Sequence, residues 1–264
     1  MDVKTRSGVR IHYEAGGEGP CVVLSHSLAC HSAMWEPQAA YLKDRYDVLR
    51  VDTRGHGLSD APGGPYTLEQ LAQDVVAVLD DHGVGRVHFV GLSMGGMIGQ
   101  LLALAHPDRV ASLTLADTTS RFPAGSEAVW EERIVTATGQ GMGALVAPTL
   151  ARWFTEDFRA RRPDVVERVG AMIRSTPVAG YVGCCHAIPK VNTTGRLGEI
   201  RCPTLVIVGE DDPGTPVAMA KTIHDAIPGS ELVVIPKASH LCNLEQPEAF
   251  NRVLGGFLDR VAGA

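Results

Sequence analysis

A serine flanked by glycines stands where a predicted strand meets a predicted helix. The segment Gly91-Leu92-Ser93-Met94-Gly95 follows an apolar run at 86–90 and opens an apolar helical pattern at 94–105. At such an elbow the serine backbone is strained and its hydroxyl is lifted above the sheet, so the residues two positions away must lack bulk. The helix N-terminus adds free N–H groups and a positive dipole end. The pattern predicts a nucleophilic Ser93 rather than a structural turn.

A serine hydroxyl is a weak nucleophile at neutral pH, so it needs a base within hydrogen-bond reach and a third group that orients the base. Folds with this elbow carry the three residues in the chain order serine, acid, histidine, each after a strand. His240 fits because it follows a predicted strand at 231–235, whereas His224 falls in the middle of a predicted helix. We therefore predict that His240 is the base.

Three carboxylates follow the predicted strand at 204–208. The pattern Gly-x-x-Asp-x-x-Thr-Pro puts Asp212 where the chain turns back toward the histidine, so Asp212 is the predicted acid. Asp211 and Asp117 stay open as alternatives, because some folds of this type carry the acid at the end of the preceding strand. Otherwise Glu210 and Asp211 are expected to be solvated turn residues.

Two backbone N–H groups are expected to form an oxyanion hole. One belongs to Met94, directly after the nucleophile, and the other to Leu28, in the loop that follows a predicted strand at 21–25. The ten histidines are scattered and form neither H-x-H-x-D-H nor H-E-x-x-H, so His26 is not expected to bind metal. We expect neither a metal nor another cofactor.

Composition excludes several classes of protein. The chain has 264 residues, 45% of them hydrophobic, with a net charge of -6 and only 5% aromatic residues, which disfavours a nucleic-acid partner. Six cysteines without C-x-x-C spacing argue for idle thiols in a reducing compartment. The N-terminus lacks an apolar leader region, and no apolar run approaches the ~18 residues of a membrane span. We expect a cytoplasmic protein; the sequence carries no signal for an oligomeric state.

The elements alternate in a way that positions these residues. Predicted strands at 9–13, 21–25, 46–51, 86–90 and 110–116 alternate with helices at 36–44, 67–82 and 94–105, which indicates a mostly parallel sheet covered on both faces. The strand signal vanishes between 121 and 201, where short helices are predicted at 130–137, 143–154, 163–175 and 178–186. Strands resume at 204–208 and 231–235, with helices at 216–227 and 247–261. We expect a core of residues 1–120 and 202–264, and a helical cap of residues 121–201 over a cleft.

The chain resembles the α/β-hydrolase superfamily over essentially its whole length, and within it the 3-oxoadipate enol-lactonases. The elbow FVGLSMGGMIGQ and the segment DTRGHGLS are shared by many esterases and perhydrolases, whereas RWFT and GYVGCCHAI are more discriminating. Further matching stretches are VLSHSLACHSAMWEPQ, PTLVIVGEDDPGTPV and ASHLCNLEQPEAF. The resemblance implies an α/β-hydrolase fold, with a mostly parallel central sheet flanked by helices and a helical cap inserted after the sixth strand.

The resemblance also implies an activity. This is the hydrolysis of 3-oxoadipate enol-lactone to 3-oxoadipate in the degradation of aromatic compounds, through an acyl-enzyme formed by a Ser-His-Asp triad. One departure concerns the substrate's carboxylate: after C-x-A-I the family has an Arg-Asp pair, and this chain has Pro189-Lys190. Three alternatives stay open: Lys190 substitutes as a point charge, the carboxylate is bound elsewhere, or the substrate lacks a carboxylate. Candidate substrate contacts in the cap are Trp130, Arg133, Arg152 and Trp153.

Residues 121–201 hold ten Arg and one Lys against eight acidic residues, although the whole chain has a net charge of -6. A basic cap favours an anionic small-molecule lactone or ester as substrate. The alternatives are a broad-specificity carboxylesterase or perhydrolase, more weakly a carbon–carbon bond hydrolase, and a non-hydrolytic ligand receptor on the same fold. A haloalkane dehalogenase is disfavoured, because its nucleophile is a carboxylate and position 93 is serine.

Overall fold

Eight strands form one sheet in the computed structural model of the protein, which describes residues 1–262. Their order is β1-β2-β4-β3-β5-β6-β7-β8. The first two strands are antiparallel to their neighbours, and all pairings from β4 to β8 are parallel. The strands are β1 (Asp2–Lys4), β2 (Arg10–Gly16), β3 (Cys21–Ser25), β4 (Asp47–Val51), β5 (Val87–Leu92), β6 (Val110–Ala116), β7 (Thr204–Gly209) and β8 (Glu231–Ile235).

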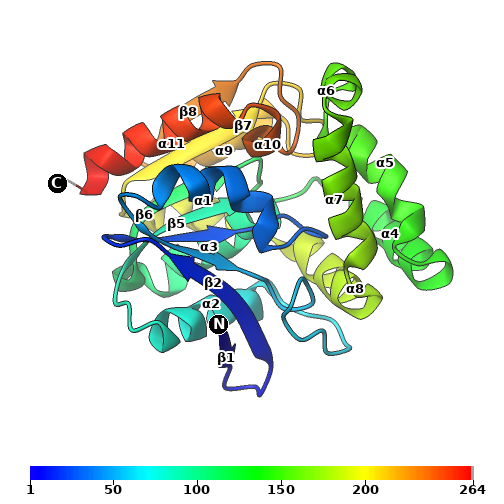
Figure 1. Ribbon diagram of the computed structural model, residues 1–264, viewed down its shortest axis with the longest axis horizontal. Coiled ribbons are helices and arrows are strands. Elements are labelled where there is room, and N and C mark those ends of the chain that lie inside the picture. Colours follow the sequence, from blue (N-terminus) through cyan, green and yellow to red (C-terminus); the bar gives the residue numbers. More distant parts are fainter. Residues whose placement is uncertain (263–264) are drawn as a thin grey trace.

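Helices cover the sheet, as a parallel sheet requires. Helices α1 (Glu36–Leu42) and α11 (Pro247–Ala262) pack against each other, as do α2 (Leu68–Asp81) and α3 (Met94–Ala105), while α9 (Val217–Ala226) packs on β7 and β8 (Figure 1). The central strands β3, β5 and β7 are buried along their whole length, which is why they read as continuous apolar runs. The expected layered α/β architecture is confirmed.

The helical insertion follows the sixth strand, as expected. It consists of α4 (Glu127–Gln140), α5 (Gly143–Trp153), α6 (Glu156–Arg161), α7 (Pro163–Ser175) and α8 (Val178–Ala187), which lie in the chain between β6 and β7. Figure 1 shows these helices, in green, gathered at one end of the sheet. Two 3-10 turns, η3 (Ile188–Lys190) and η4 (Thr194–Glu199), lead back to the sheet. The division into a core and a cap at residues 120/121 and 201/202 stays a prediction.

Three short elements were not predicted from the sequence. Strand β1 has three residues and exists because it pairs with β2, and α6 is one and a half turns long and starts at the N-cap Thr155. Helix α10 (Cys242–Glu245) is a single turn next to the predicted base. Elements this short depend on tertiary contacts rather than on a repeating apolar pattern.

Two features are absent from residues 1–262. Within residues 1–262 no helix has the length and the apolar character that a bilayer crossing requires. In the same range no three His, Cys, Asp or Glu side chains lie close enough together to share a metal ion.

Candidate active site

Ser93 lies at the sharp turn between β5 and α3. Its φ of 56° falls in the left-handed region, and its N–H donates to the Ala116 carbonyl at 2.9 Å. A Cβ on Gly91 would lie 2.2 Å from the Gly95 carbonyl oxygen, and a Cβ on Gly95 would lie 2.2 Å from the Ser25 carbonyl oxygen. Such distances exclude any side chain, so the two glycines permit the elbow and the strained serine conformation.

His240 and Asp212 form a buried pair. The His240 Nδ1–H donates to Asp212 Oδ2 at 2.8 Å, which leaves Nε2 as the acceptor nitrogen. Burial works against the charge on both groups, but each is stabilised by the other. The charge and hydrogen bond of Asp212 therefore raise the pKa of His240 above its usual value, and His240 together with Thr215 lowers the pKa of Asp212. The pair has the arrangement of a general base and the acid that orients it.

The loop after β7, residues 209–216, is named the acid loop here. It holds Asp212 through three donors besides His240: the N–H groups of Gly214 (2.8 Å) and Thr215 (3.1 Å) and the Thr215 hydroxyl (2.6 Å). Asp211 is exposed. The other alternative, Asp117, is buried but accepts from the Gly209 N–H rather than from the histidine. Of the three carboxylates, Asp212 is the one bonded to His240.

A cavity of ≈ 100 Å³ opens between the strand ends and the inserted helices. It brings together most residues that the sequence singled out. Lys190 is absent from its lining and is exposed at the end of η3. The lining residues are Ser27, Leu28, Ser93, Met97, Phe122, Trp130, Arg133, Arg152, Trp153, Ile188, Asp212, Gly214, Thr215 and His240.

Of the two predicted oxyanion donors, Met94 follows Ser93 in the chain but is not among the lining residues, and Leu28 lines the cavity. As the first residue of α3, Met94 has an N–H that helix geometry leaves without an intrahelical acceptor. Leu28 lies in the oxyanion loop, residues 26–30, and lines the cavity beside Ser93. Its neighbour Ala29 has a φ of 59°, a conformation that L-residues rarely adopt, so the loop must be held in place by its surroundings.

Two fully buried histidines hold the oxyanion loop against the loop after β4, residues 52–60, named the support loop. The Ala29 N–H donates to His56 Nε2 at 3.0 Å, and the Thr53 N–H donates to His26 Nε2 at 2.9 Å. The opposite ring nitrogens donate to the carbonyls of Arg54 and Ser27. Burial lowers the pKa of His26 to about 4 and that of His56 to about 3. Both imidazoles are therefore neutral at pH 7, as acceptance at Nε2 requires.

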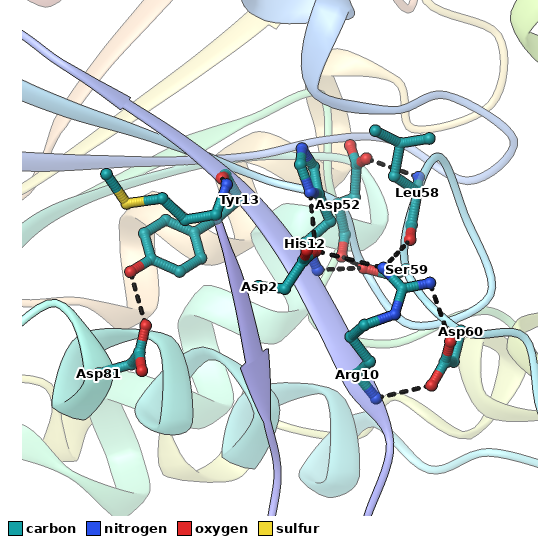
Figure 2. A network of polar contacts seen from close by, with 10 residues as sticks. Asp2, Arg10, His12, Tyr13, Asp52, Leu58, Ser59, Asp60 and Asp81 are labelled. Atoms are coloured by element: carbon teal, nitrogen blue, oxygen red, sulfur yellow. Dashed lines mark hydrogen bonds and ion pairs between the residues drawn. The ribbon is translucent and has the colours of Figure 1, made fainter.

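The support loop is itself fixed to β2, as Figure 2 shows. Both the N–H and the guanidinium of Arg10 donate to the Asp60 carboxylate, at 2.8 and 3.0 Å. The His12 N–H donates to the Ser59 hydroxyl at 2.8 Å, and this hydroxyl donates to the Asp52 carbonyl at 2.6 Å. These supports were not predicted from the sequence, although Asp52 and Ser59 belong to the segment DTRGHGLS, which is shared by many esterases and perhydrolases.

Replacing His56 with Ala should slow catalysis without unfolding the protein. The Ala29 N–H would lose its acceptor and the Leu28 N–H its fixed position. We expect kcat to fall about 10- to 100-fold, less than the ~10²–10³ for loss of a donor itself. KM should change little. Steady-state kinetics at pH 7 measures both values. His56→Gln should recover part of the rate because its amide oxygen accepts; His82→Ala, at the end of α2, is the control. A folded His56→Ala protein with wild-type kcat would contradict this role.

The loop that carries His240, residues 236–241, is tied to the inserted helices. The Ser239 hydroxyl donates to the Arg152 carbonyl at 2.9 Å, and the Leu241 N–H donates to the Trp153 carbonyl at 3.2 Å. The Trp153 ring lies 5.9 Å from the His240 ring, centroid to centroid. Glu245, which no sequence pattern singled out, accepts from the Ser239 N–H at 2.8 Å and from the N–H of Thr155, the N-cap of α6. The segment around Trp153 is therefore hydrogen-bonded to residues 236–241, which are called the histidine loop below.

Two arginines reach the same cavity without a carboxylate partner in residues 1–262. Arg133 lies over the Trp130 ring, 4.4 Å from its centroid. Arg152 is half-buried and donates to the Thr149 hydroxyl at 3.3 Å. Burial, and secondarily the charge of Arg133, lowers the pKa of Arg152. Two unneutralised cations beside one cavity make it attractive to an anion.

Comparison with known proteins gives concordant matches. The model of a family described as alpha/beta hydrolase fold matches residues 20–247. The 3-oxoadipate enol-lactonase 2 of Acinetobacter baylyi is 36% identical, over 98% of this chain and 97% of the relative. The solved enol-lactonase from Burkholderia xenovorans LB400 has a TM-score of 0.95 and 39% identity, covering 98% of this chain and 100% of that one. A thermophilic esterase from Thermogutta terrifontis, solved with malate bound, has a TM-score of 0.95 and 30% identity, covering 99% and 98%.

Proposed function

Because this chain belongs to the alpha/beta hydrolase family, we propose that it opens an anionic lactone ring through an acyl-enzyme on Ser93. Its substrate on this proposal is 3-oxoadipate enol-lactone, the compound named by relatives at 36% and 34% identity. The observation that carries the proposal is one cavity lined by Ser93, by the bonded pair His240 and Asp212, and by two arginines without acidic partners in residues 1–262. Residues 121–201 supply both arginines and act as the cap.

The first half of the reaction forms the acyl-enzyme. The Ser93 Oγ attacks the lactone carbonyl carbon while His240 Nε2 takes the hydroxyl proton, and the N–H groups of Leu28 and Met94 hold the oxyanion. The ring C–O bond then breaks. The leaving oxygen departs as an enolate, which needs little help from an acid. It takes the proton held by the His240 imidazolium, which restores the neutral base, and the resulting enol tautomerises to the ketone in water. Asp212 stabilises the imidazolium throughout.

The second half releases the product. His240 takes a proton from water, which attacks the acyl carbonyl in the same oxyanion hole, and the C–O bond to Ser93 breaks. The proton returns from His240 to the serine oxygen, and the product leaves as a carboxylic acid, which ionises by losing its proton to water. No step requires a cofactor, since His240 exchanges protons with serine, enolate and water.

The substrate's own carboxylate is bound, on this proposal, by Arg133 and Arg152. Arg152 faces a second cation in a half-buried setting, so an anion between them relieves both the desolvation and the repulsion. Arg133 stacks on Trp130, which restricts the guanidinium before the substrate arrives. Lys190, the substitute considered from sequence, is exposed outside the cavity lining.

Substituting either arginine should weaken binding of an anionic substrate selectively. Arg152→Met and Arg133→Met each remove a charge-assisted contact worth ~1.5–3 kcal/mol, so KM for the enol-lactone should rise about 10- to 100-fold. The KM for neutral p-nitrophenyl acetate should stay within a few-fold. Initial-rate kinetics on both substrates measures this, with Lys190→Met as the matched control. A rise in KM confined to Lys190→Met would place the carboxylate at that lysine instead.

A broad-specificity carboxylesterase is the second candidate. The observation in its favour is the 30% identity to a solved esterase over nearly the full length of both chains. The two functions separate by kcat/KM on the enol-lactone and on short p-nitrophenyl esters. Lactonase function predicts a clear preference for the enol-lactone, and a preference for the neutral esters would support the esterase.

A further inference from the structure

A second buried carboxyl lies behind the candidate catalytic pair. Asp117 follows β6, has no exposed surface, and adopts a φ of 42° in the left-handed region. Its N–H donates to the Ile207 carbonyl at 2.9 Å, and its Oδ1 accepts from the Gly209 N–H at 2.7 Å, at the start of the acid loop. Its Oδ2 is buried and has no hydrogen-bond partner within residues 1–262.

The two carboxyls are supported very differently. Asp212 accepts from two N–H groups, from the Thr215 hydroxyl and from His240, whereas Asp117 accepts from one N–H and has beside it only the Cys242 thiol, a weak donor, among residues 1–262. Donors aimed at a carboxylate stabilise its ionised form, and a buried charge without them is strongly destabilised. A negative charge in this site therefore belongs on Asp212.

The titratable groups around Asp117 come from three segments. They are Asp212 in the acid loop, His240 in the histidine loop and the buried Cys242 thiol of α10. Burial raises the pKa of Cys242 well above its usual value, so the thiol is neutral at pH 7. Among the described residues that act on Asp117, the ionised carboxylate is thus Asp212 and the group able to become a cation is His240.

We propose that the buried carboxyls of Asp117 and Asp212 together carry a single negative charge behind His240. Asp212 is the ionised carboxylate and Asp117 holds the proton. When Asp212 cannot carry the charge, Asp117 ionises in its place. Asp117 is a positioning residue on this proposal, since it acts on the imidazolium through the buried site rather than on the substrate. The proposal rests on the Ser93, His240 and Asp212 triad of the proposed function.

The electrostatics of the site agree with this assignment. Burial, reinforced by the charge of Asp212, raises the pKa of Asp117 to about 8, while His240 and Thr215 lower that of Asp212. Two carboxyls in one desolvated site resist double ionisation, and their protons are coupled. Removing the charge of Asp212 removes the repulsion, so Asp117 then ionises at lower pH and supports the imidazolium.

The kinetic test compares Asp212→Asn, the double variant Asp212→Asn/Asp117→Asn, and Ser93→Ala as the background. Hydrolysis of p-nitrophenyl acetate is followed from about pH 5 to about pH 10. A triad without any acid loses ~10⁴ in kcat. If Asp117 ionises in place of Asp212, kcat of Asp212→Asn should fall only about 10²-fold. The kcat of the double variant should fall about 10²-fold further. Equal rates for Asp212→Asn and the double variant, both folded by circular dichroism, would overturn the proposal.

Infrared spectroscopy gives a second readout that does not depend on activity. The C=O stretching band of a buried protonated carboxylic acid should be present at pH 7, disappear above about pH 8, and be absent from Asp117→Asn. Asp211→Asn, an exposed carboxylate in the acid loop, is the matched control and should keep the band. A wild-type spectrum without this band at pH 7 would overturn the proposal. A Ser93→Ala protein with wild-type rate would instead reject the proposed function, and the band would still report on Asp117.

Discussion

Ser93→Ala is expected to lower kcat by ~10⁴–10⁶ while the protein stays folded. The substitution removes the attacking oxygen and leaves the oxyanion donors, the His240–Asp212 bond and the elbow glycines in place. The residual rate then comes from the oxyanion hole and from binding alone. Stopped-flow or steady-state kinetics on the enol-lactone and on a p-nitrophenyl ester measures the fall in kcat.

The same variant reports on the strain at the elbow. Alanine in the left-handed conformation of residue 93 is as strained as serine, so its melting temperature should remain close to that of the wild type. Circular dichroism is the control for folding. Retention of near-full rate by folded Ser93→Ala would refute Ser93 as the nucleophile.

His240→Gln is the second substitution expected to have a very large effect. Glutamine fills a similar volume and keeps a hydrogen bond to Asp212 but cannot take the serine proton, so we expect kcat to fall by ~10⁴–10⁶. The wild-type pH profile tests the same assignment. Protonated His240 cannot act as a base, so kcat/KM should rise with pH through the pKa of His240.

The direction of the rise in kcat/KM and the pH at which it occurs follow from the buried pair of His240 and Asp212. Asp212 raises the pKa of His240, so the acid limb of kcat/KM should lie above the usual histidine value of ~6.5. The double variant Asp212→Asn/Asp117→Asn removes both carboxylates that raise the pKa of His240 and should move the limb to lower pH. A limb unaffected by the double substitution, or a folded His240→Gln protein with wild-type kcat, would contradict the assignment.

The candidate catalytic residues could be selected from the sequence because their types and positions are constrained locally. An elbow needs glycines at 91 and 95, and the carboxyl ends of β5, β7 and β8 meet at one edge of the sheet, so Ser93, Asp212 and His240 follow from the chain order. The main elements, such as α3 and β6, follow from apolar periodicity, and their observed bounds match those expected from sequence.

The supports of these residues were not predictable in the same way. His56 and Glu245 act by bonding loops that are distant in the sequence, and nothing in the local pattern distinguishes them from solvated residues. Lys190 was a candidate for binding the substrate's carboxylate because it follows the C-x-A-I segment. In the structure it is exposed at the end of η3, whereas Arg152, near the end of α5, lines the cavity. The packing of the inserted helices therefore places Arg152, and not Lys190, at the cavity.

Covalent labelling by a fluorophosphonate, followed by peptide mass spectrometry, tests the central claim most directly. The reagent reacts with a serine whose neighbouring base and oxyanion hole are in place. The account predicts one adduct on the peptide that contains Ser93, lost in Ser93→Ala and strongly slowed in His240→Gln. A folded wild-type protein that remains unlabelled, or that carries the adduct on another residue, would contradict it.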